Sequence, residues 1–419
     1  MAKYIVRGGN RLSGEVSIHG AKNAVLPILA ATLLVPSSTI LDCPNLSDVS
    51  TACAILAHLG CAVTRQDSTV SVSANELISC TIPEHLMGEM RSSVVFLGAI
   101  IARCGQARVS MPGGCELGPR PINLHLSALE KLGVRIVEDH GYLNCTAPTR
   151  LRGANIILDF PSVGATENIM LAAVTALGET VIHNPAREPE ILDLAAFLQK
   201  AGAKIHFGEN GTIYIQGVEA LRSTEHTVIP DRIEAATYLC AGAITGGEIL
   251  INKTDNRHMT ALLPLLEESG CKLRMSERSI HLTAPSRIKA LGPVRTMPYP
   301  GFPTDAGSPL MALCCLAQGS SVFVENIFEN RYKHAAELAR MGAKIRIEGR
   351  VAIVEGVRQL HGASLTCTDL RGGAALCLAA LAAEGQSEIR DTYHIDRGYQ
   401  DFDANLARLG ARIDTIDNI

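Results

Sequence analysis

The 419-residue sequence contains no tryptophan, and aromatic residues make up only 4% of it. Its core must therefore be built from Ala, Leu, Ile and Val, in keeping with a hydrophobic share of 47%. A strong net charge is also lacking, because 38 basic residues accompany 42 acidic ones. Without a broad positive field the chain has no general means of holding nucleic acid or an anionic membrane, so an anionic ligand must be bound by a local cluster of cations.

The sequence has no apolar run long enough to cross a membrane. Residues 93–102 and 374–383 are its longest apolar runs, well short of the roughly 18 residues that a bilayer requires. The opening MAKYIVRGGN lacks the apolar stretch of a signal peptide. The 13 cysteines lie mostly in apolar helical stretches, which indicates free thiols and a cytoplasmic protein. No CxxC or HExxH motif occurs, so we expect no metal site.

A repeated unit runs through the whole chain. The segments AHLGCAV, EKLGVRI, QKAGAKI, EESGCKL, ARMGAKI and ARLGARI recur every 68 to 73 residues. Each glycine is predicted to end a helix, where glycine adopts a positive φ at low cost. The pattern around it predicts a helix of small apolar residues, a strand, an amphipathic helix and then a β-hairpin. Because the first helix is apolar nearly all round, we expect it to be buried on all sides.

Six units divide naturally into two α/β domains of three units each. We place the first domain at residues 21–229. The second domain is then discontinuous, with residues 1–20 preceding residues 230–419, and the strand pair within 1–20 is expected to complete the last unit. A solenoid of six stacked units is the alternative, but solenoid repeats are usually shorter and their helices keep an exposed face.

The second unit departs from the repeat at VSMPGGCELGPRPINLH (109–125). The distance from the residue that opens the strand to the helix-ending glycine is 28 residues here, against 23 to 25 in the other units. The extra residues surround Cys115, and Arg120 follows five positions later. A nearby cation lowers the pKa of a thiol and makes it more reactive. A loose surface loop and a buried structural cysteine are the alternatives.

Charged residues open the helices that should otherwise be inert. They are Lys22 with Asn23, Arg91, Asp231 with Arg232, Asp305, and Asp369 with Arg371. A cation at a helix N-terminus opposes the helix dipole, and a bound anion would compensate for it. If these helices point at one cleft, the cations form a site for a ligand with phosphates and a carboxylate. Asp231 can equally be a simple N-cap, and Arg397 in HIDRGY can equally be a solvated charge.

Several motifs together resemble the UDP-N-acetylglucosamine 1-carboxyvinyltransferase family. They are AKNAVLPILAATLL, PGGCELGPRPINLH, FPSVGATENIM, AREPEI, PGFPTD, FENR, TDLR and YHIDRGY, and they follow the family's order from end to end. The resemblance implies the enolpyruvyltransferase fold, an inside-out α/β barrel in two domains. It also implies transfer of the enolpyruvyl group of phosphoenolpyruvate to the 3′-hydroxyl of UDP-N-acetylglucosamine, the first committed step of bacterial peptidoglycan synthesis. No metal or organic cofactor is implied, and we expect a monomer.

The resemblance also assigns roles to individual residues. Cys115 would protonate the enol carbon, form an adduct with phosphoenolpyruvate and be alkylated by fosfomycin, and Asp305 would act as general base. Phosphoenolpyruvate would be held by Lys22, Arg120 and Arg397, with Asn23 near the reacting centre. The sugar nucleotide would contact Arg91, Arg120, Pro121, Ile122, Asn123, Leu124, His125, Ser162, Val163, Gly164, Ala165, Asp305 and Ile327. Asp369, Arg331 and Arg371 would support the cleft.

Two positions depart from the family pattern. Phe160 stands where some members carry Lys, which removes a possible diphosphate contact. Gly307, in TDAGSP, stands where many members carry Gln, so an amide is missing there.

Two other functions remain open on the sequence alone. A shikimate-phosphate enolpyruvyltransferase would bind phosphoenolpyruvate in the same way but would lack the loop that carries the cysteine. A second copy that binds the sugar nucleotide and regulates cell-wall synthesis would not need Cys115, Asp305 and Arg397 together.

Overall fold

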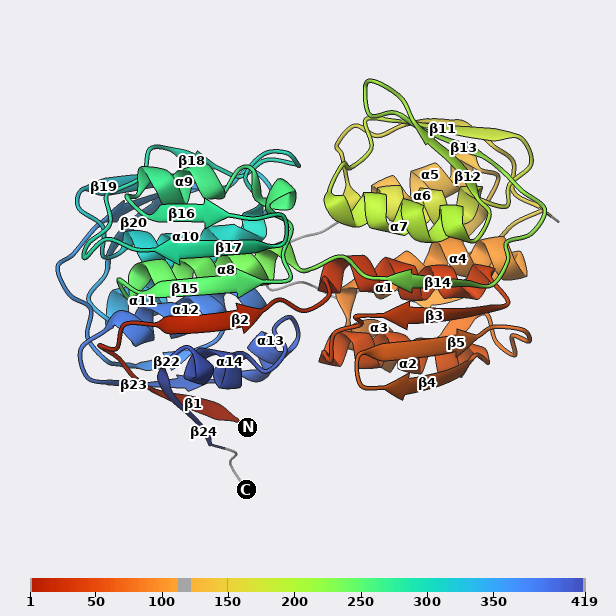
Figure 1. Cartoon of the computed structure of the whole chain (residues 1–419). Coiled ribbons are helices and arrows are strands. Elements are labelled where there is room, and N and C mark those ends of the chain that lie inside the picture. The colour runs from red at the N-terminus through yellow and green to blue at the C-terminus, as the bar shows by residue number, and fades with distance from the viewer. Residues whose placement is uncertain (1, 112–121, 149, 417–419) are drawn as a thin grey trace. The chain divides into compact units, whose positions relative to one another are not determined.

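The computed structural model describes residues 2–111, 122–148 and 150–416. These residues form two compact units. The first unit comprises the described part of residues 20–229, and the second comprises residues 2–19 with 230–416. Each unit contains three four-stranded sheets and a set of helices (Figure 1). The predicted site residues Cys115, Arg120 and Pro121 lie outside the described residues.

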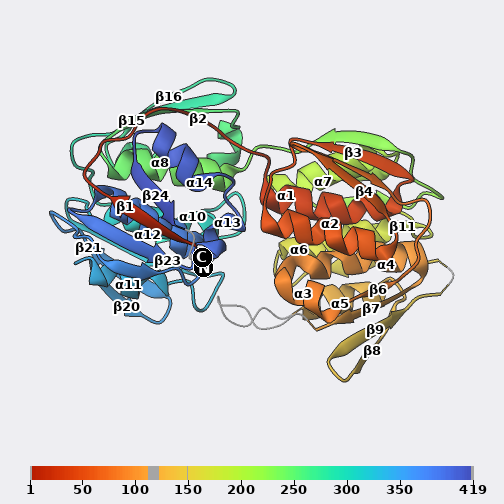
Figure 2. The same ribbon diagram turned by 90° about the horizontal axis from the view of Figure 1, so that it is seen from below.

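The first unit carries three sheets, each with one parallel and two antiparallel strand pairs. In order across each sheet, the strands are β14 (Thr224–Thr227), β3 (Ser37–Leu41), β5 (Thr69–Ser73) and β4 (Ala62–Gln66); β6 (Thr81–Ile82), β7 (Gln106–Ser110), β9 (Tyr142–Thr146) and β8 (Arg135–Asp139); and β10 (Asn155–Ile157), β11 (Glu179–His183), β13 (Ile213–Gln216) and β12 (Lys204–Phe207). The β8–β9 hairpin extends from the body of the unit (Figure 2).

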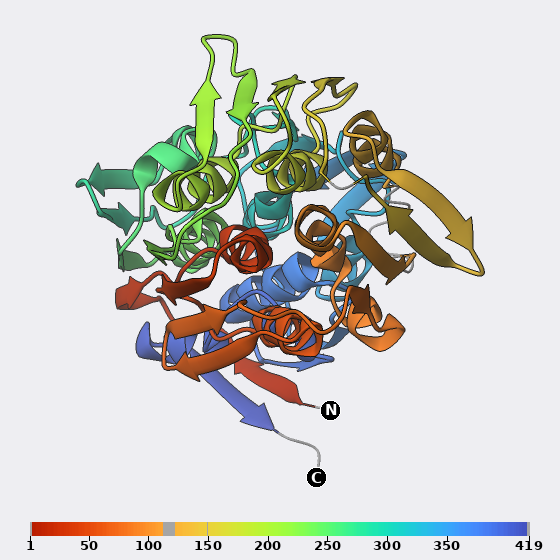
Figure 3. The same cartoon turned by 90° about the vertical axis from the view of Figure 1, so that its right-hand side faces the viewer.

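The helices of the first unit alternate with these strands. They are α1 (Lys22–Ala31), η1 (Thr32–Leu34), α2 (Ser47–Leu59), α3 (Glu84–Glu89), η2 (Arg91–Val95), α4 (Phe96–Cys104), α5 (Asn123–Lys131), α6 (Val163–Ala173) and α7 (Pro189–Lys200). Figure 3 shows the helices of this unit nearly end on, with the strand hairpins outside them. The helices α1, α4 and α6 are buried along most of their length, as the apolar pattern predicts.

The second unit repeats the arrangement. Its sheets contain β16 (Lys272–Met275), β17 (Ser279–Thr283), β15 (Glu248–Asn252) and β2 (Ser13–Ser17); β18 (Val294–Arg295), β19 (Ser320–Val324), β21 (Val351–Glu355) and β20 (Lys344–Glu348); and β22 (Ser364–Thr366), β23 (Gln386–Arg390), β1 (Lys3–Arg7) and β24 (Arg412–Ile416). Its helices are α8 (Arg232–Ile244), η3 (Asn256–Met259), α9 (Leu263–Glu268), α10 (Thr304–Cys314), α11 (His334–Arg340), α12 (Leu370–Ala382), α13 (Tyr393–Asp396) and α14 (Phe402–Arg408).

Three helices form the centre of the second unit. Helix α10 packs against both α8 and α12, and α8 also contacts α12. Every residue of α8 is buried, and α12 is buried from Arg371 to Leu381. Ala and Gly recur along α8 and α12, so the helix backbones can approach one another closely.

The N-terminal strands correct one expectation. Residues 1–20 were expected to complete the last unit as a strand pair, but only β1 joins that sheet, between β23 and β24. Strand β2 instead pairs in parallel with β15 of the fourth unit. The two strands do not form a hairpin because both edges of β1 are already paired, one with β23 and the other with β24. The alternating pattern predicted both strands but not their partners.

In the described residues, a histidine anchors the chain just before it passes from one unit to the other near residue 20 and again near residue 229. Before the first passage, the backbone N–H of His19 donates to Oε2 of Glu234, and His19 Nδ1 lies 2.9 Å from Oε1 of the same carboxyl group. Before the second passage, His226 Nε2 lies 2.8 Å from Oδ1 of Asp193, whose Oδ2 accepts from the backbone N–H of Ile229. Each carboxyl group belongs to a buried part of a helix, α8 or α7.

The six repeat glycines all have positive φ angles, between 92° and 108°, as predicted. The residues are Gly60, Gly133, Gly202, Gly270, Gly342 and Gly410. They follow the amphipathic helix of each unit directly or after one residue, and the next strand begins two residues later. An L-residue is strained in this conformation, so the glycines fix the point where each helix ends and the chain turns into the next strand.

We predict that Gly202→Ala lowers the free energy of unfolding by about 1–2 kcal/mol, because an alanine there must keep a left-handed backbone. Steric clash is not the cause, since the nearest atom to an added Cβ is Arg222 Nε at 3.9 Å. Gly88→Ala, in α3 of the same unit with open space around it, is the matched control and should leave stability unchanged or raise it by up to about 1 kcal/mol. Urea unfolding measures both; equal effects of the two variants would contradict the prediction.

Candidate active site

Charged residues open the central helices where the sequence placed them. Lys22 is the first residue of α1, Arg91 the first of η2, which leads into α4, and Arg232 the first of α8. Asp305 and Arg371 are the second residues of α10 and α12. Since the rest of each helix is largely buried among apolar side chains, these first turns concentrate the polar chemistry of both units.

The positive charge of Lys22 has an internal partner that the sequence argument missed. Lys22 Nζ lies 2.6 Å from Oδ2 of Asp48 in α2, and both side chains are buried. A buried charge needs such a partner because burial removes its hydration. A bound anion is therefore not required to explain Lys22 at the start of α1, although the ion pair fixes where the ammonium group lies.

Asp305 belongs to a charge network of four residues. Arg331 Nη2 donates to Asp305 Oδ1 at 2.9 Å, and Arg371 lies on the other oxygen, with Nη2 at 3.3 Å and Nε at 3.4 Å from Oδ2. Arg331 also donates to the backbone carbonyl of Thr304. The fourth residue is Asp369, whose Oδ1 lies 3.9 Å from Arg331 Nη1. The sequence-predicted residues Asp305, Arg331, Asp369 and Arg371 are thus brought together.

Within this network Asp305 is the accessible acid. Its side chain is 27% exposed, whereas those of Arg331 and Arg371 are 3% and 2% exposed. The Arg371 guanidinium also lies over the Tyr399 ring, at 5.0 Å from its centroid. Two buried guanidinium groups therefore fix the orientation of one carboxylate that solvent or a substrate can reach.

Asp231 and Asp369 are helix caps. Oδ1 of Asp231 accepts hydrogen bonds from the backbone N–H groups of Ile233 and Glu234. Oδ1 of Asp369 accepts in the same way from Arg371 and Gly372. Asp231 is therefore the N-cap of α8, which is one of the two interpretations that the sequence allows. Asp369 is the N-cap of α12 and fixes the backbone that carries Arg371.

His334 adjoins the network. Its side chain is 1% exposed, and the backbone of Arg331 lies near its ring. Burial lowers the pKa of His334 to about 4, and the nearby charges of Asp369 and Arg331 act on it in opposite directions. The ring is therefore neutral at physiological pH, so it fills space beside the ion pairs without adding charge.

Glu325 is a second residue that the sequence argument missed. This buried carboxylate directly follows β19 and accepts hydrogen bonds from Thr296 Oγ1, Thr304 Oγ1 and the backbone N–H groups of Ile327 and Phe328. It thereby connects the start of α10, next to Asp305, with the segment that carries the predicted contact residue Ile327. A glutamate directly after the apolar strand SVFV was the available signal.

The predicted sugar-nucleotide contacts of the first unit lie on two helix starts. Ile122 is the N-cap of α5, and Asn123, Leu124 and His125 form its first turn. Ser162 caps α6, where its side chain accepts from the backbone N–H of Ala165 at 3.3 Å. The two helix starts are adjacent, since a Cβ added at Gly164 would lie 2.8 Å from Cε1 of His125. Val163 is the first residue of α6 and lies between Ser162 and Gly164 in the sequence.

The remaining predicted residues are placed by their elements. Asn23 is exposed in the first turn of α1, and Arg397 is half-buried directly after α13, before the last helix α14. Phe160, which departs from the family pattern, is 44% exposed. Gly307 lies in α10 with open space where a side chain would start. A larger residue could therefore be accommodated at position 307.

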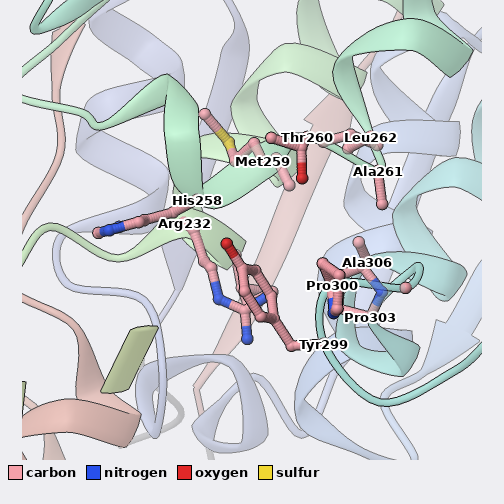
Figure 4. A pocket seen from close by; sticks show the side chains of 13 residues that line it. Arg232, His258, Met259, Thr260, Ala261, Leu262, Tyr299, Pro300, Pro303 and Ala306 are labelled. Carbon is pink, nitrogen blue, oxygen red and sulfur yellow. The ribbon is translucent and has the colours of Figure 1, made fainter. Parts of the chain in front are cut away.

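A small cavity lies beside Arg232 in the second unit (Figure 4). The Arg232 guanidinium lies 5.6 Å from the centroid of the Tyr299 ring, and Met259, Pro303 and Ala306 line the cavity as well. Its volume is about 10 Å³, which is room for about one water molecule. This cavity is therefore too small to hold a substrate.

The described cysteines are suited to structural roles. All twelve carry free thiols, and most are buried. Burial raises the pKa of Cys43 to about 12 and those of Cys61 and Cys145 to about 11. Such thiols are almost entirely protonated at neutral pH and react slowly.

Within residues 2–111, 122–148 and 150–416, no group of three or more His, Cys, Asp or Glu side chains is placed to hold a metal ion. In the same residues, none of the helices combines the length and the apolar character needed to cross a bilayer.

Comparison with known proteins identifies the family. Residues 6–406 match the family model described as EPSP synthase (3-phosphoshikimate 1-carboxyvinyltransferase). The chain therefore belongs to this family of enolpyruvyl transferases. This confirms the class of protein expected from the sequence motifs.

Individual relatives narrow the comparison. The chain is 49% identical over 414 residues, 99% of each chain, to UDP-N-acetylglucosamine 1-carboxyvinyltransferase 2 of Caldanaerobacter subterraneus. It is 50% identical over 420 residues, 99% of this chain and 95% of the relative, to UDP-N-acetylglucosamine 1-carboxyvinyltransferase 1 of Symbiobacterium thermophilum.

Solved structures support the fold. The enolpyruvyl transferase NikO of Streptomyces tendae is 27% identical and superimposes with a TM-score of 0.90 over 99% of this chain and 98% of its own. EPSP synthase of Acinetobacter baumannii is 17% identical, with a TM-score of 0.77 over the full length of both chains, and shares the fold. The expected enolpyruvyltransferase fold is confirmed.

We predict a pH-dependent stability effect at Glu167 in α6. Burial, and next the charges of Glu190 and Glu188, raise the pKa of Glu167 well above its ordinary range. A carboxyl group whose pKa is higher in the folded state stabilises the fold below its unfolded pKa, and this contribution is lost as the pH rises. Glutamine does not titrate, so the Glu167→Gln protein does not lose this contribution. The Tm of the variant minus the Tm of the unmodified protein should therefore increase by about 2 °C or more from pH 5 to pH 8.

Thermal unfolding at several pH values tests this effect. Glu179→Gln, at an exposed position on β11 of the same unit, is the matched control and should show no such trend. A Tm difference for Glu167→Gln that stays constant or shrinks with rising pH would disprove the assigned pKa direction.

Proposed function

We propose that this protein transfers the enolpyruvyl group of phosphoenolpyruvate to the 3′-hydroxyl of UDP-N-acetylglucosamine and releases phosphate. This reaction is the first committed step of bacterial peptidoglycan synthesis. The observation that carries the proposal is the identity of about half of all residues to proteins named for this activity, over nearly the whole chain. The free thiols of the described cysteines suit a reducing cytoplasm as the place of the reaction.

Three cations hold phosphoenolpyruvate in this proposal. Lys22, Arg120 and Arg397 bind its phosphate and carboxylate, and Asn23 lies near the reacting centre. The burial of Lys22 against Asp48 supports its role, because it fixes the ammonium group at the start of α1. A positioned cation stabilises the departing phosphate without first reorganising its surroundings.

The sugar nucleotide is bound by residues of several helix starts. In this proposal its contacts are Arg91, Arg120, Pro121, Ile122, Asn123, Leu124, His125, Ser162, Val163, Gly164, Ala165, Asp305 and Ile327. The N-terminal turn of α6 offers backbone N–H groups and the positive end of the helix dipole, both of which suit a phosphate group. Phe160 provides no charge in this region, so the helix start contributes more to binding the diphosphate than in members with Lys there.

Two groups move protons during the reaction. Cys115 donates a proton to the enol carbon of phosphoenolpyruvate, and Asp305 accepts the proton of the attacking 3′-hydroxyl. Positive charge develops on the adjacent carbon while the hydroxyl oxygen bonds to it, and expulsion of phosphate with loss of a proton then restores the double bond. Arg331 and Arg371 hold the Asp305 carboxylate in place for this step, with Asp369 fixing the start of α12. No cofactor takes part, and the protein acts as a monomer.

A phosphate-release assay tests the proposed function. We expect release from phosphoenolpyruvate when UDP-N-acetylglucosamine is the acceptor and no release when shikimate 3-phosphate is offered in its place. The reverse preference would identify the protein as a shikimate-phosphate enolpyruvyltransferase. Binding of the sugar nucleotide without release of phosphate would instead support a regulatory copy.

We predict that Cys115→Ser abolishes inactivation by fosfomycin and lowers phosphate release by about 100-fold or more, because a serine hydroxyl is a much weaker proton donor than a thiol. Activity after incubation with the drug is the measurement. Cys53→Ser, which removes a half-buried thiol whose pKa is raised by burial, is the control and should remain sensitive. Full inactivation of the Cys115→Ser protein would show that another residue is alkylated.

A further inference from the structure

Asn168 lies at the centre of a buried hydrogen-bond network in the first unit. Its side chain is 0% exposed in α6. Oδ1 accepts from the backbone N–H of Gly98 at 2.7 Å. Nδ2 lies 3.0 Å from the carbonyl oxygen of Val94 and 2.9 Å from Nδ1 of His125. One amide thus connects η2, α4 and the first turn of α5.

These contacts permit one orientation of the amide. The backbone N–H of Gly98 can only donate, so the side-chain oxygen of Asn168 must face it and the amide nitrogen must face His125. An amide nitrogen also only donates. Nδ1 of His125 must therefore accept, and the neutral imidazole carries its proton on Nε2. A proton on Nδ1 would point at the N–H groups of Asn168.

The Nε2 side of the ring lies against the start of α6. A Cβ added at Gly164 would lie 3.2 Å from Nε2 and 2.8 Å from Cε1 of His125. Ser162, Val163 and the backbone N–H groups of the first turn of α6 adjoin this position. Asn168 holds the ring from the Nδ1 side. The amide nitrogen of Asn168 also lies 3.4 Å from the carbonyl oxygen of Gly164.

We propose that Asn168 is a positioning residue that keeps the proton of His125 on Nε2, so that His125 donates a hydrogen bond to a phosphate oxygen of the sugar nucleotide. The inference rests on the proposed function, which places the diphosphate at this helix start. A phosphate oxygen is the suitable partner because the backbone donors and helix dipole at the start of α6 favour an anion. If the proton were on Nδ1, Nε2 would present a lone pair to the anion and repel it.

Nuclear magnetic resonance of the full-length protein with ¹⁵N-labelled histidine tests the proton position directly. The His125→Gln spectrum assigns the His125 signals. Without any ligand, we expect Nε2 protonated and Nδ1 unprotonated. Asn168→Asp keeps the size of the side chain but places an acceptor oxygen against Nδ1, so Nδ1 should become protonated. A protonated Nδ1 of His125 in the unmodified protein would overturn the proposal.

Steady-state kinetics test the consequence for binding. For Asn168→Asp we expect the KM for UDP-N-acetylglucosamine to rise about tenfold, the loss of one hydrogen bond to a charged group, while the KM for phosphoenolpyruvate changes less than about twofold. Asn405→Asp is the matched control, since Asn405 is a buried asparagine in the second unit whose amide donates to the carbonyl oxygen of Gln400. Both of its KM values should be unchanged.

The kinetic outcomes separate the possible failures. An equal rise in both KM values for Asn168→Asp, or the same selective rise for Asn405→Asp, would mean that Asn168 has only a structural role and would overturn the proposal. If UDP-N-acetylglucosamine proves not to be a substrate, the proposed function and the phosphate contact fail together. The protonation of His125 measured by magnetic resonance would still show whether Asn168 fixes the ring.

Discussion

A helix that is buried on all sides has little room for charged side chains away from its ends, and this constraint organises both units. Helix α8 is buried from Arg232 to Ile244 and α12 from Arg371 to Leu381, so neither has a solvent-exposed face along its length. The backbone N–H groups and the charged side chains of a first turn are then the natural place for chemistry. The same repeated unit that builds the core therefore also presents the charged residues to which the proposed function assigns substrate binding.

Placing cations at these buried turns requires compensation within the protein. Asp48 neutralises Lys22, and Asp305 accepts from both Arg331 and Arg371. These ion pairs remove the cost of burying unpaired charges and, at the same time, fix the geometry of the charged groups before a substrate arrives. The neutral ring of His334 beside the Asp305 network adds no further charge that would disturb this balance. Preorganised charge of this kind is what a reaction that expels phosphate requires.

The sequence predicted most of the fold because the repeat is visible in it. Spacing of the glycines, apolar periodicity and charged helix starts all follow from local rules, and the motifs identified the family. What it could not supply were contacts between residues far apart in the chain. The separation of β1 from β2, the pairing of Lys22 with Asp48 and the anchoring of Thr304 and Ile327 by Glu325 depend on tertiary packing. The role of Asn168 is of the same kind, since His125 lies 43 positions away.

The central claim is that the first turns of the buried helices bind the substrates. A crystal structure of the protein with bound UDP-N-acetylglucosamine tests it most directly. The account predicts a phosphate oxygen within hydrogen-bond distance of His125 Nε2 and the first backbone N–H groups of α6, and the sugar 3′-hydroxyl beside Asp305. A well-ordered sugar nucleotide that contacts none of these helix starts would contradict it.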